Sequence, residues 1–522
     1  MQLDIYNNSW ISLETMDGKT AKTGIRDCIA QAHSIKKVWV DGCATYIDNI
    51  APITLMTMIL ARVFRPDREA KLDMYDIGEF DISAVDDYIN ECKLKGVSFD
   101  IFDKDKPFLQ CSMEQLEKIS DGKPKKLREL KGTLGKLEPF YSSGNNVLFY
   151  NTRKYTDDQT AEDQYVMTPE QYAASLIRNH MYRSASGSGH VSTGNGSQPP
   201  LTVIVNGKNL FETLLFMLPE DIKDSDLPMW ERNRYDADIT EYIASGNFGF
   251  LGSTLWPVEY IHYGDIENGL VKNVYTAGIY KGAEDEEKPA HYQEIFTKNQ
   301  PCSLIHIKKD EKKETESWYA TTLRPDTSPW LEMASSDSGN FGSLPATDFI
   351  KALGDEELID KKRRFDCTVY GLTLSSTSIP DPAQTVYGLS FPEGLLSPGA
   401  GKLTKVLAKR IKDLGWCLKT CLTGYDRSVS SESEKSSMKE DTEISDSCRR
   451  FMESCAGKAE HKWLDMIADS PTEDTFLAIE KEAEADVMKA YDRYVPVRDD
   501  FIKQTEYRNK LYSIIHSSYA KR

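Results

Sequence analysis

The sequence after Ser397-Pro398-Gly399 repeats one kind of pattern, in which apolar residues recur every three or four positions. This spacing places the apolar residues on one face of a helix. Four such segments follow one another, at about 400–424, 434–469, 472–495 and 500–521. Breaks at Gly424, Ser470-Pro471 and Pro496 leave short connections, which favour antiparallel neighbours. The sequence therefore predicts an antiparallel four-helix bundle over residues 398–522.

The residues before this bundle mix helical and β-rich patterns without an internal repeat. Asp17-Gly18 is typical of a hairpin turn, and the apolar run 52–64 reads as a helix with Pro52 at its start and Pro66 after its end. Short β-rich runs follow at Phe248–Trp256, Ser303–Ile307 and Thr368–Leu374. We expect an α+β protein with a large mixed domain over residues 1–397, followed by the bundle.

Within the mixed domain, residues 183–218 combine a loop with rigid elements. A Gly/Ser-rich stretch leads into a short strand at Leu201–Val205, a turn and an apolar helix. Asn209 is suited to cap this helix, and Glu212 completes the spacing of a capping box. Folds often present backbone to a ligand on a loop anchored in this way. The 183–200 stretch is therefore a candidate binding loop.

The charge of the chain limits its contacts with nucleic acid. Acidic residues (82) outnumber basic ones (64), giving a formal net charge of −18, so the chain is a poor general binder of polyanions. Any such contact must come from local basic patches or from partner subunits. Residues 123–136 carry six basic residues and one acid, which fits either a solvated helix face or a phosphate-facing patch. Phe149 and Tyr150, further on, either stack on bases or belong to the core.

Motifs for catalysis are missing. Gly18-Lys19-Thr20 lacks the upstream glycine of a phosphate-binding loop, and the chain has neither a GxSxG elbow nor an HExxH helix. The helical spacing of Cys417 with Cys421, and of Cys448 with Cys455, favours packing over metal ligation. We therefore expect a binding or assembly protein rather than an enzyme, with no metal and no cofactor.

The ten cysteines form no CxxC motif, and neither a signal peptide nor a membrane-length apolar run is found. We expect reduced, mostly buried thiols in a cytoplasmic protein that does not enter a membrane.

Six segments in one order resemble the CasA family, which supplies the large subunit of the type I-E CRISPR Cascade complex. They read LDIYNNSWISL, FDIFDKDKPFLQ, SGNNVLFYN, TVIVNGKNLFETLLFMLP, LPMWER (227–232) and FGFLGSTLWPVEYI (248–261). The resemblance covers most of the first 400 residues, and the family's two-part architecture agrees with the predicted bundle.

The resemblance implies a function in antiviral defence. CasA proteins recognise the protospacer-adjacent motif in double-stranded DNA, help start duplex unwinding and R-loop formation, and recruit the separate helicase-nuclease. The implied partners are the other Cascade subunits, crRNA, double-stranded target DNA and the CRISPR helicase-nuclease. Guide pairing reads the long sequence, so this subunit needs few DNA contacts. Two alternatives are a scaffold that does not read DNA and an enzyme with an unrecognised site.

The resemblance also assigns site residues. The family's guide-RNA loop falls on Phe149, Tyr150 and Asn151. Its minor-groove glycine loop falls on Gly187, Ser188 and Gly189, with Gly194 and Gly196 as the alternative register. A family lysine that enters the minor groove corresponds to Lys272, and a lysine there meets mainly acceptors, which tolerates several motifs.

In some family members a glutamine-bearing hairpin enters the duplex beside the motif. The corresponding tract here, Tyr370–Thr377, has no glutamine at its tip, so Ser376 or Thr377 takes that place or the wedge is weaker. The preceding basic run is expected to hold phosphates nearby; it consists of Lys361, Lys362, Arg363 and Arg364. Some relatives bind metal through cysteines in mid-chain, but residues 262–300 contain no cysteine, so we expect no zinc there.

Overall fold

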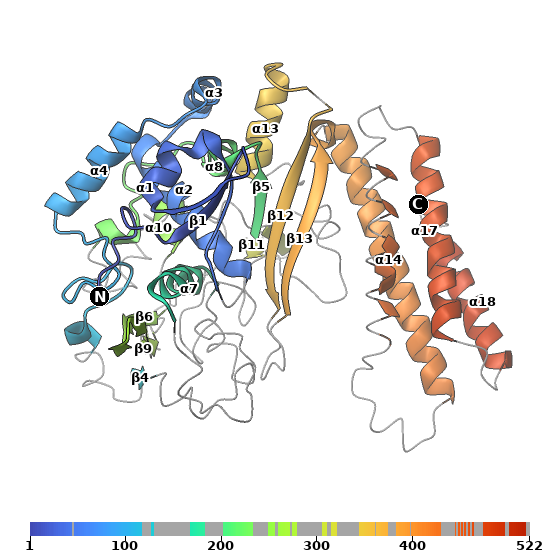
Figure 1. The fold of residues 1–522 in the computed structure, drawn as a ribbon. Helices are drawn as coiled ribbons and strands as arrows, with labels where there is room; N and C mark the ends of the chain where they lie inside the picture. Colours follow the sequence, from blue (N-terminus) through green and yellow to red (C-terminus); the bar gives the residue numbers. More distant parts are fainter. Residues whose placement is uncertain are drawn as a thin grey trace. The chain divides into compact units, whose positions relative to one another are not determined.

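The computed structural model describes most of the helices and strands of the chain. It covers residues 1–43, 46–116, 127–129, 167–182, 202–232, 249–255, 259–271, 274–278, 305–310, 315–320, 344–360, 362–373, 383–396, 398–429, 473–495 and 501–517, and helical residues between 444 and 463. The chain forms two compact units (Figure 1). The first consists of residues 1–322, 344–350 and 366–388, and the second of 323–343, 351–365 and 389–522. The sequence had predicted one boundary, at residue 397.

The first unit begins with a three-stranded antiparallel sheet. Strands β1 (Ile11–Thr15), β2 (Thr20–Thr23) and β3 (Ile35–Trp39) lie in the order β2-β1-β3. The β1–β2 connection turns at Gly18, whose φ of 83° suits glycine, so the hairpin predicted at Asp17-Gly18 is confirmed. Short helices α1 (Ile25–Ala30) and η1 (Ala32–Ser34) lead to β3.

Helix α2 (Ile50–Phe64) is the central buried helix of this unit. Residues 50–61 are all buried, and α2 contacts α4 (Ile82–Leu94), α7 (Pro169–Tyr182) and α8 (Leu210–Met217). The helix begins two residues before Pro52 and ends at Arg65, whose φ of 41° is left-handed. Pro66 then prevents its continuation. The predicted apolar helix is confirmed.

A second sheet joins distant parts of the sequence. Strands β5 (Thr202–Asn206), β12 (Arg364–Thr373) and β13 (Ala383–Pro392) lie in the order β13-β12-β5. Helix α8 packs against β5, and all eight of its residues are buried. Asn209 Oδ1 accepts the Glu212 amide at 3.0 Å, which confirms the predicted cap. The Glu212 carboxylate reaches back to the Lys208 amide instead of the Asn209 amide, so the capping box is shifted by one residue.

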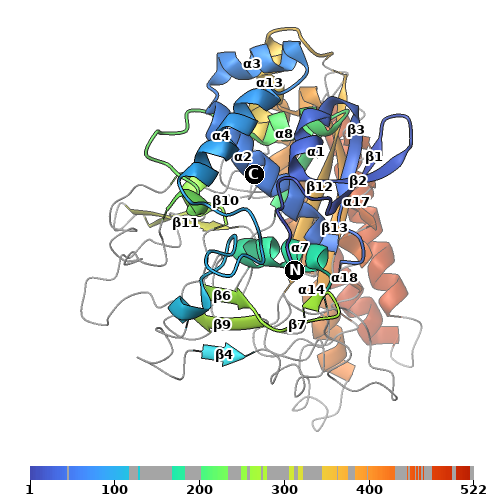
Figure 2. The same ribbon diagram turned by 60° about the vertical axis from the view of Figure 1, so that its left-hand side comes forward.

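The other described strands are short. β4 (Leu127–Glu129), β9 (Val274–Gly278) and β6 (Glu259–Tyr263) form one sheet (Figure 2), β7 (Ile266–Glu267) pairs with β8 (Leu270–Val271), and β10 (Ile305–Asp310) pairs with β11 (Thr315–Ala320). The run predicted as β-rich at 248–256 is wrong, because it contains a helical turn, α10 (Phe250–Ser253). The Asp226 carboxylate accepts the Gly249, Leu251 and Gly252 amides and so favours the helical turn.

Three long helices of the second unit run side by side in Figure 1: α14 (Pro398–Val429), α17 (Glu473–Tyr494) and α18 (Phe501–Ser517). In the predicted helix 434–469, the described helical residues are buried at positions three or four apart: Ile444, Cys448, Phe451, Met452, Cys455, Ala459 and Trp463. The predicted four-helix bundle remains a prediction, because much of that segment lies outside the described residues. None of the helices in the described ranges is long and apolar enough to span a bilayer.

Candidate nucleic-acid interface

Antiparallel pairing of β5 with β12 brings two predicted DNA-binding segments to one end of a sheet. Thr202 pairs with Tyr370, and Asn206 pairs with Asp366. The 183–200 stretch precedes β5, and the 374–382 tract follows β12. Because Thr202 lies beside Tyr370, these two segments join the sheet at the same end. The segments themselves lie outside the described residues, but their junctions with the sheet do not.

The turn after β5 is fixed by close packing. The Gly207 amide donates to Thr213 Oγ1 at 2.9 Å, and a Cβ on Gly207 would collide with the Glu212 side chain. The Asn206 side chain donates to Thr368 Oγ1 at 2.9 Å, which links the end of β5 to β12. These contacts hold the strand, the turn and α8 as one rigid support.

The 183–200 stretch begins directly after α7, which is also anchored in the core. Arg178 Nε lies 2.9 Å from Asp48 Oδ1, and both side chains are almost fully buried. The Tyr172 hydroxyl donates to Gln110 Oε1 at 2.6 Å, and the His180 Nε2 lies 2.9 Å from the Leu109 carbonyl oxygen. The candidate binding loop therefore starts and ends at well-packed elements.

Four cations at three-residue intervals, which we call the basic ladder, hold the tract from Leu218 to Arg232. They are Arg62, Arg65, Arg68 and Lys71. Arg62 binds Glu231, Arg65 binds Asp224 and carbonyls from 223 to 226, Arg68 binds Glu220, and Lys71 binds the Leu218 carbonyl. As the residue number of the cation rises along the ladder, the residue number of its partner falls from 231 to 218. The ladder thus fastens the LPMWER segment to α2 through Glu231, and the residues before it, from Leu218, to α3 (Arg68–Ile77).

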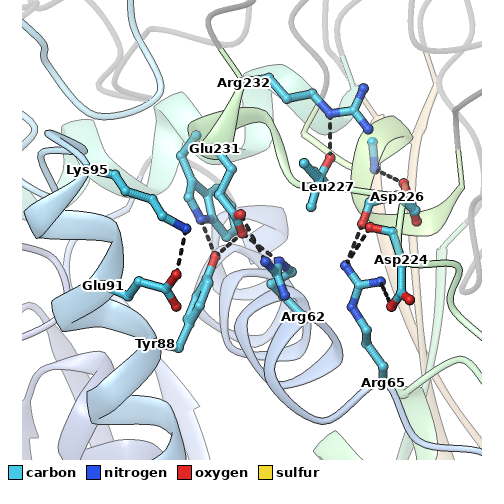
Figure 3. Close-up of polar contacts among 12 residues, drawn as sticks. Arg62, Arg65, Tyr88, Glu91, Lys95, Asp224, Asp226, Leu227, Glu231 and Arg232 are labelled. Atoms are coloured by element: carbon cyan, nitrogen blue, oxygen red, sulfur yellow. Dashed lines mark hydrogen bonds and ion pairs between the residues drawn. The ribbon is translucent and has the colours of Figure 1, made fainter.

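Glu231 is the most connected partner of the ladder (Figure 3). Its carboxylate accepts Arg62 at 2.6 and 3.0 Å and the Tyr88 hydroxyl at 2.7 Å. The Trp230 indole donates to the same hydroxyl at 2.8 Å. Burial, and then the negative charge of Glu231, raise the pKa of Tyr88, so its hydroxyl stays a donor. Charge-assisted bonds of this kind are the strong ones in proteins.

Lys71, at the other end of the ladder, has no exposed surface. Its Nζ donates to the Leu218 carbonyl at 2.8 Å, lies 3.7 Å from the Glu220 carboxylate and 4.2 Å from the centroid of the Phe349 ring. Burial lowers the pKa of Lys71 to about 7, against the opposite effect of Glu220. The cation therefore sits at the end of α8 with a desolvation cost that its neighbours only partly offset.

The ladder also reaches α10 through Asp226. Arg65 donates to the Asp226 backbone carbonyl at 3.1 Å, while the Asp226 carboxylate holds the amides of the 249–252 turn at 2.8–3.0 Å. A Cβ on Gly249 would collide with that carboxylate. Arg65 and Asp226 therefore link the 249–252 turn to the basic ladder. This turn belongs to the 248–261 segment, and the LPMWER segment follows Asp226 directly; both segments carry the family resemblance.

Three of the predicted DNA-binding residues lie in the described part of the chain. Lys362 and Arg363 precede β12, and Arg364 is its first residue. The Arg363 guanidinium lies 4.6 Å from the Phe365 ring, and Arg364 Nε donates to Ser390 Oγ at 3.2 Å. A ten-residue strand spans about 30 Å. These residues lie at the start of β12, and the tract with Ser376 and Thr377 follows its other end, so their contact with phosphates stays a prediction.

The other predicted site residues lie outside the described ranges. They are Phe149, Tyr150, Asn151, Gly187, Ser188, Gly189, Lys272, Lys361, Ser376 and Thr377. In the described ranges, no three His, Cys, Asp or Glu side chains gather as metal ligands would. Burial raises the pKa of the Cys421 thiol to about 11 and of the Cys455 thiol to about 12, which keeps both protonated.

The basic ladder was missed by sequence reasoning. Its signal was present, because Arg62, Arg65, Arg68 and Lys71 recur every third residue, and Glu220, Asp221, Asp224, Asp226 and Glu231 gather in one later tract. The two patterns lie about 150 residues apart, with pair separations from 147 to 169. Neither pattern alone identifies the other as its partner.

The fold defined by these units is that of the Cse1, or CasA, proteins. Thermobifida fusca Cse1 matches with a TM-score of 0.69 at 14% identity, covering 99% of this chain and 98% of that chain. Thermus thermophilus CasA (Cse1) matches with a TM-score of 0.65 at 17% identity, over 99% of both chains. A chain of a CRISPR RNA-guided surveillance complex matches with a TM-score of 0.64 at 14% identity, also over 99% of both.

The family follows from the sequence. The model of the family of CRISPR-associated protein Cse1 matches residues 4–494. This chain therefore belongs to the Cse1 family, and the resemblance to CasA proteins is confirmed. No curated protein matches the chain by sequence.

Proposed function

We propose that this chain is the large subunit of an RNA-guided Cascade surveillance complex. In this role it recognises the protospacer-adjacent motif in double-stranded DNA, helps start unwinding and R-loop formation, and recruits the helicase-nuclease. The family match over residues 4–494 carries the proposal. A solved chain with the same fold comes from a CRISPR RNA-guided surveillance complex, which supports the other subunits and the guide RNA as partners.

The sheet geometry supports reading of a short motif. A motif of a few base pairs is about 10 Å long at 3.4 Å per pair, so its readers must lie close together. Pairing of Thr202 with Tyr370 joins the glycine stretch and the 374–382 tract to the same sheet end. In the proposal, the Gly187–Gly189 backbone and Lys272 contact the minor groove, and Ser376 or Thr377 adjoins the separating base pairs.

The basic run before β12 has a separate task in this proposal. Lys362, Arg363 and Arg364 are a strand length away from the 374–382 tract, and about 30 Å corresponds to about nine base pairs of duplex. Phosphate contacts there would orient the flanking DNA and would not read its sequence. Phe149, Tyr150 and Asn151 are proposed to contact the guide RNA.

The test uses assembled complexes that carry Lys272→Ala, or Gly187→Pro together with Gly189→Pro. Affinity is measured for two target duplexes that differ only in the flanking motif. We expect the affinity ratio between good and bad motif to fall at least about tenfold in each variant, since minor-groove contacts carry about 1–3 kcal/mol. Lys95→Ala, an exposed lysine on the surface after α4, is the control and should keep the ratio.

An unchanged ratio in both variants would remove the direct reading role. If a complex without this chain kept the flanking preference, the chain would be a scaffold.

A further inference from the structure

The segment FDIFDKDKPFLQ (99–110) carries part of the family resemblance, but it has no task in the proposed function. In the structure it contacts two other segments that carry the resemblance. The Ile5 amide of the opening segment donates to the Phe99 carbonyl at 3.0 Å. The ring centroid of Phe108 lies 5.7 Å from that of Trp230 in the LPMWER segment. The segment is therefore placed to hold neighbouring parts of the first unit together.

Gln110, the last residue of this segment, is buried and bonds to two elements outside it. Its Oε1 atom accepts the Tyr172 hydroxyl of α7 at 2.6 Å and the Tyr263 amide of β6 at 2.9 Å. Its Nε2 atom donates to the Ile101 carbonyl at 2.8 Å, within the segment. A side-chain amide offers its donors and acceptors in fixed directions, so this one fixes α7 and β6 relative to the segment. Figure 2 shows α7 next to the sheet that contains β6.

Leu109 holds the same helix at a second point. Its carbonyl oxygen lies 2.9 Å from His180 Nε2, and because a carbonyl only accepts, the ring nitrogen donates. The φ of Leu109 is 60°, in the left-handed region that residues with a side chain rarely adopt and that surrounding contacts must enforce. His180 and Tyr172 are eight positions apart, about 12 Å along the helix. Two consecutive residues, which we call the 109–110 clamp, thus hold α7 at two points.

Helix α7 connects two segments that the proposed function assigns to the minor groove. The 183–200 stretch follows its last residue, Tyr182. Just before its other end, Met167 exchanges two backbone hydrogen bonds with Val271, at 3.0 and 2.8 Å, and Lys272 follows Val271 directly. The helix has 14 residues and is about 21 Å long. The placement of α7 therefore sets where the chain enters both segments.

We propose that Leu109 and Gln110 are positioning residues for reading of the flanking motif. This inference rests on the proposed function, in which neither residue contacts DNA. Without the clamp, α7 keeps its bridge to Val271 but loses two of the contacts that fix its direction, so the start of the 183–200 stretch shifts relative to Lys272. Binding groups must lie within about 0.5 Å of their productive positions, so a small tilt of α7 lowers discrimination between motifs.

The first test measures the affinity ratio of assembled complexes for two target duplexes that differ only in the flanking motif. Tyr172→Phe removes one hydroxyl and keeps the ring that stacks on Phe102. We expect the ratio to fall about twofold to tenfold, since the effect cannot exceed the free energy of the lost hydrogen bond. His180→Leu should lower the ratio likewise, and His180→Gln, whose amide nitrogen can take the place of Nε2, should restore most of it. Misfolding alone lowers binding of both duplexes by the same factor and leaves the ratio unchanged.

Tyr491→Phe is the matched control. Tyr491 is also fully buried, and its hydroxyl donates to another neutral acceptor, the Gln504 carbonyl, at 3.1 Å in the second unit. This variant should lose stability as Tyr172→Phe does and keep the affinity ratio of the wild type. Equal reduction of the ratio by both tyrosine variants would overturn the proposal. So would an unchanged ratio in Tyr172→Phe and His180→Leu while Lys272→Ala lowers it, a result that leaves the proposed function intact.

The second test needs no DNA and separates this inference from the proposed function. Hydrogen exchange of the full chain is followed by mass spectrometry. Peptides from α7 should exchange at least about threefold faster in Tyr172→Phe and His180→Leu than in the wild type or in Tyr491→Phe, because local opening becomes easier. If the wild-type complex shows no flanking preference, the proposed function fails, while the exchange result still decides whether the 109–110 clamp holds α7. Unchanged exchange of α7 in both clamp variants would overturn the inference even where motif reading is confirmed.

Discussion

Glu231 binds two side chains at once, those of Arg62 and Tyr88, so its charge contributes much of the support for the LPMWER tract. Replacement of Glu231 by Gln keeps the shape but leaves the half-buried Arg62 cation without its carboxylate. Because charge-assisted bonds contribute about 1.5–3 kcal/mol, we expect the free energy of unfolding to fall by about 2–3 kcal/mol. Urea denaturation followed by circular dichroism measures this loss.

Glu91→Gln is the control for that change, since Glu91 also pairs with a cation, Lys95, but both side chains are about 60% exposed. The urea midpoint of this variant should match the wild type within error. Equal losses of unfolding free energy in both variants would show that the Glu231 network stabilises the fold no more than an exposed ion pair does.

Lys71 predicts a dependence of stability on pH. Its pKa is about 7 in the folded chain and 10.5 as the unperturbed reference, so between these values the unfolded chain binds a proton that the folded chain does not. The free energy of unfolding should therefore rise with pH from about 7 to 10.5, by up to about 1.4 kcal/mol per pH unit, and this contribution should be flat below pH 7.

Lys71→Met should abolish that rise, while Lys104→Met, at an exposed loop position, should keep it. The measurement is the difference in unfolding free energy between wild type and each variant at pH 6.5, 8 and 9.5. A pH-independent difference for Lys71→Met would contradict the prediction.

Three helices of the second unit meet at one arginine. Arg410 of α14 binds Glu480 and Glu484 of α17 at 3.0 and 2.9 Å and the Ile515 carbonyl of α18 at 3.1 Å. Arg410→Met removes this cation from the fully buried Glu480. Breaking a buried pair in this way costs about 3–5 kcal/mol, and we expect a loss of that size in chemical denaturation.

Arg508→Met tests whether burial is the reason. Arg508 pairs with Asp492 at 2.7 Å, but both side chains are more than 40% exposed. The expected loss is below about 1 kcal/mol. If the two arginine variants lost the same free energy of unfolding, burial of the Arg410 charges would not explain the stability of the junction of α14, α17 and α18.

At the level of helices and strands, local signals were accurate where the interactions were local. The hairpin at Asp17-Gly18, the apolar helix 52–64 and the Asn209 cap each depend on residues within a few positions, and each was predicted. The 248–256 run was mistaken for a strand, because its conformation depends on the Asp226 carboxylate, more than twenty residues earlier. A side chain at that distance leaves no periodic pattern in the run itself.

For the whole molecule, the candidate interface could be predicted only in part. The resemblance named the segments, but β5 and β12 pair residues 160 or more positions apart, such as Thr202 with Tyr370. No local pattern in either strand specifies that partner. Local patterns also did not show that a continuous ten-residue strand separates Arg364 from the start of the 374–382 tract.

The basic ladder has a consequence for the evolution of this chain. Its three arginines each pair with a different carboxylate in the tract from Leu218 to Glu231, so a change on one side is harmful until the other side changes with it. Substitutions in the two stretches should accumulate in compensating pairs. Homologues in which Glu231 has lost its charge should then also have replaced the arginine at position 62, and the two stretches should be inherited as one block when related genes recombine.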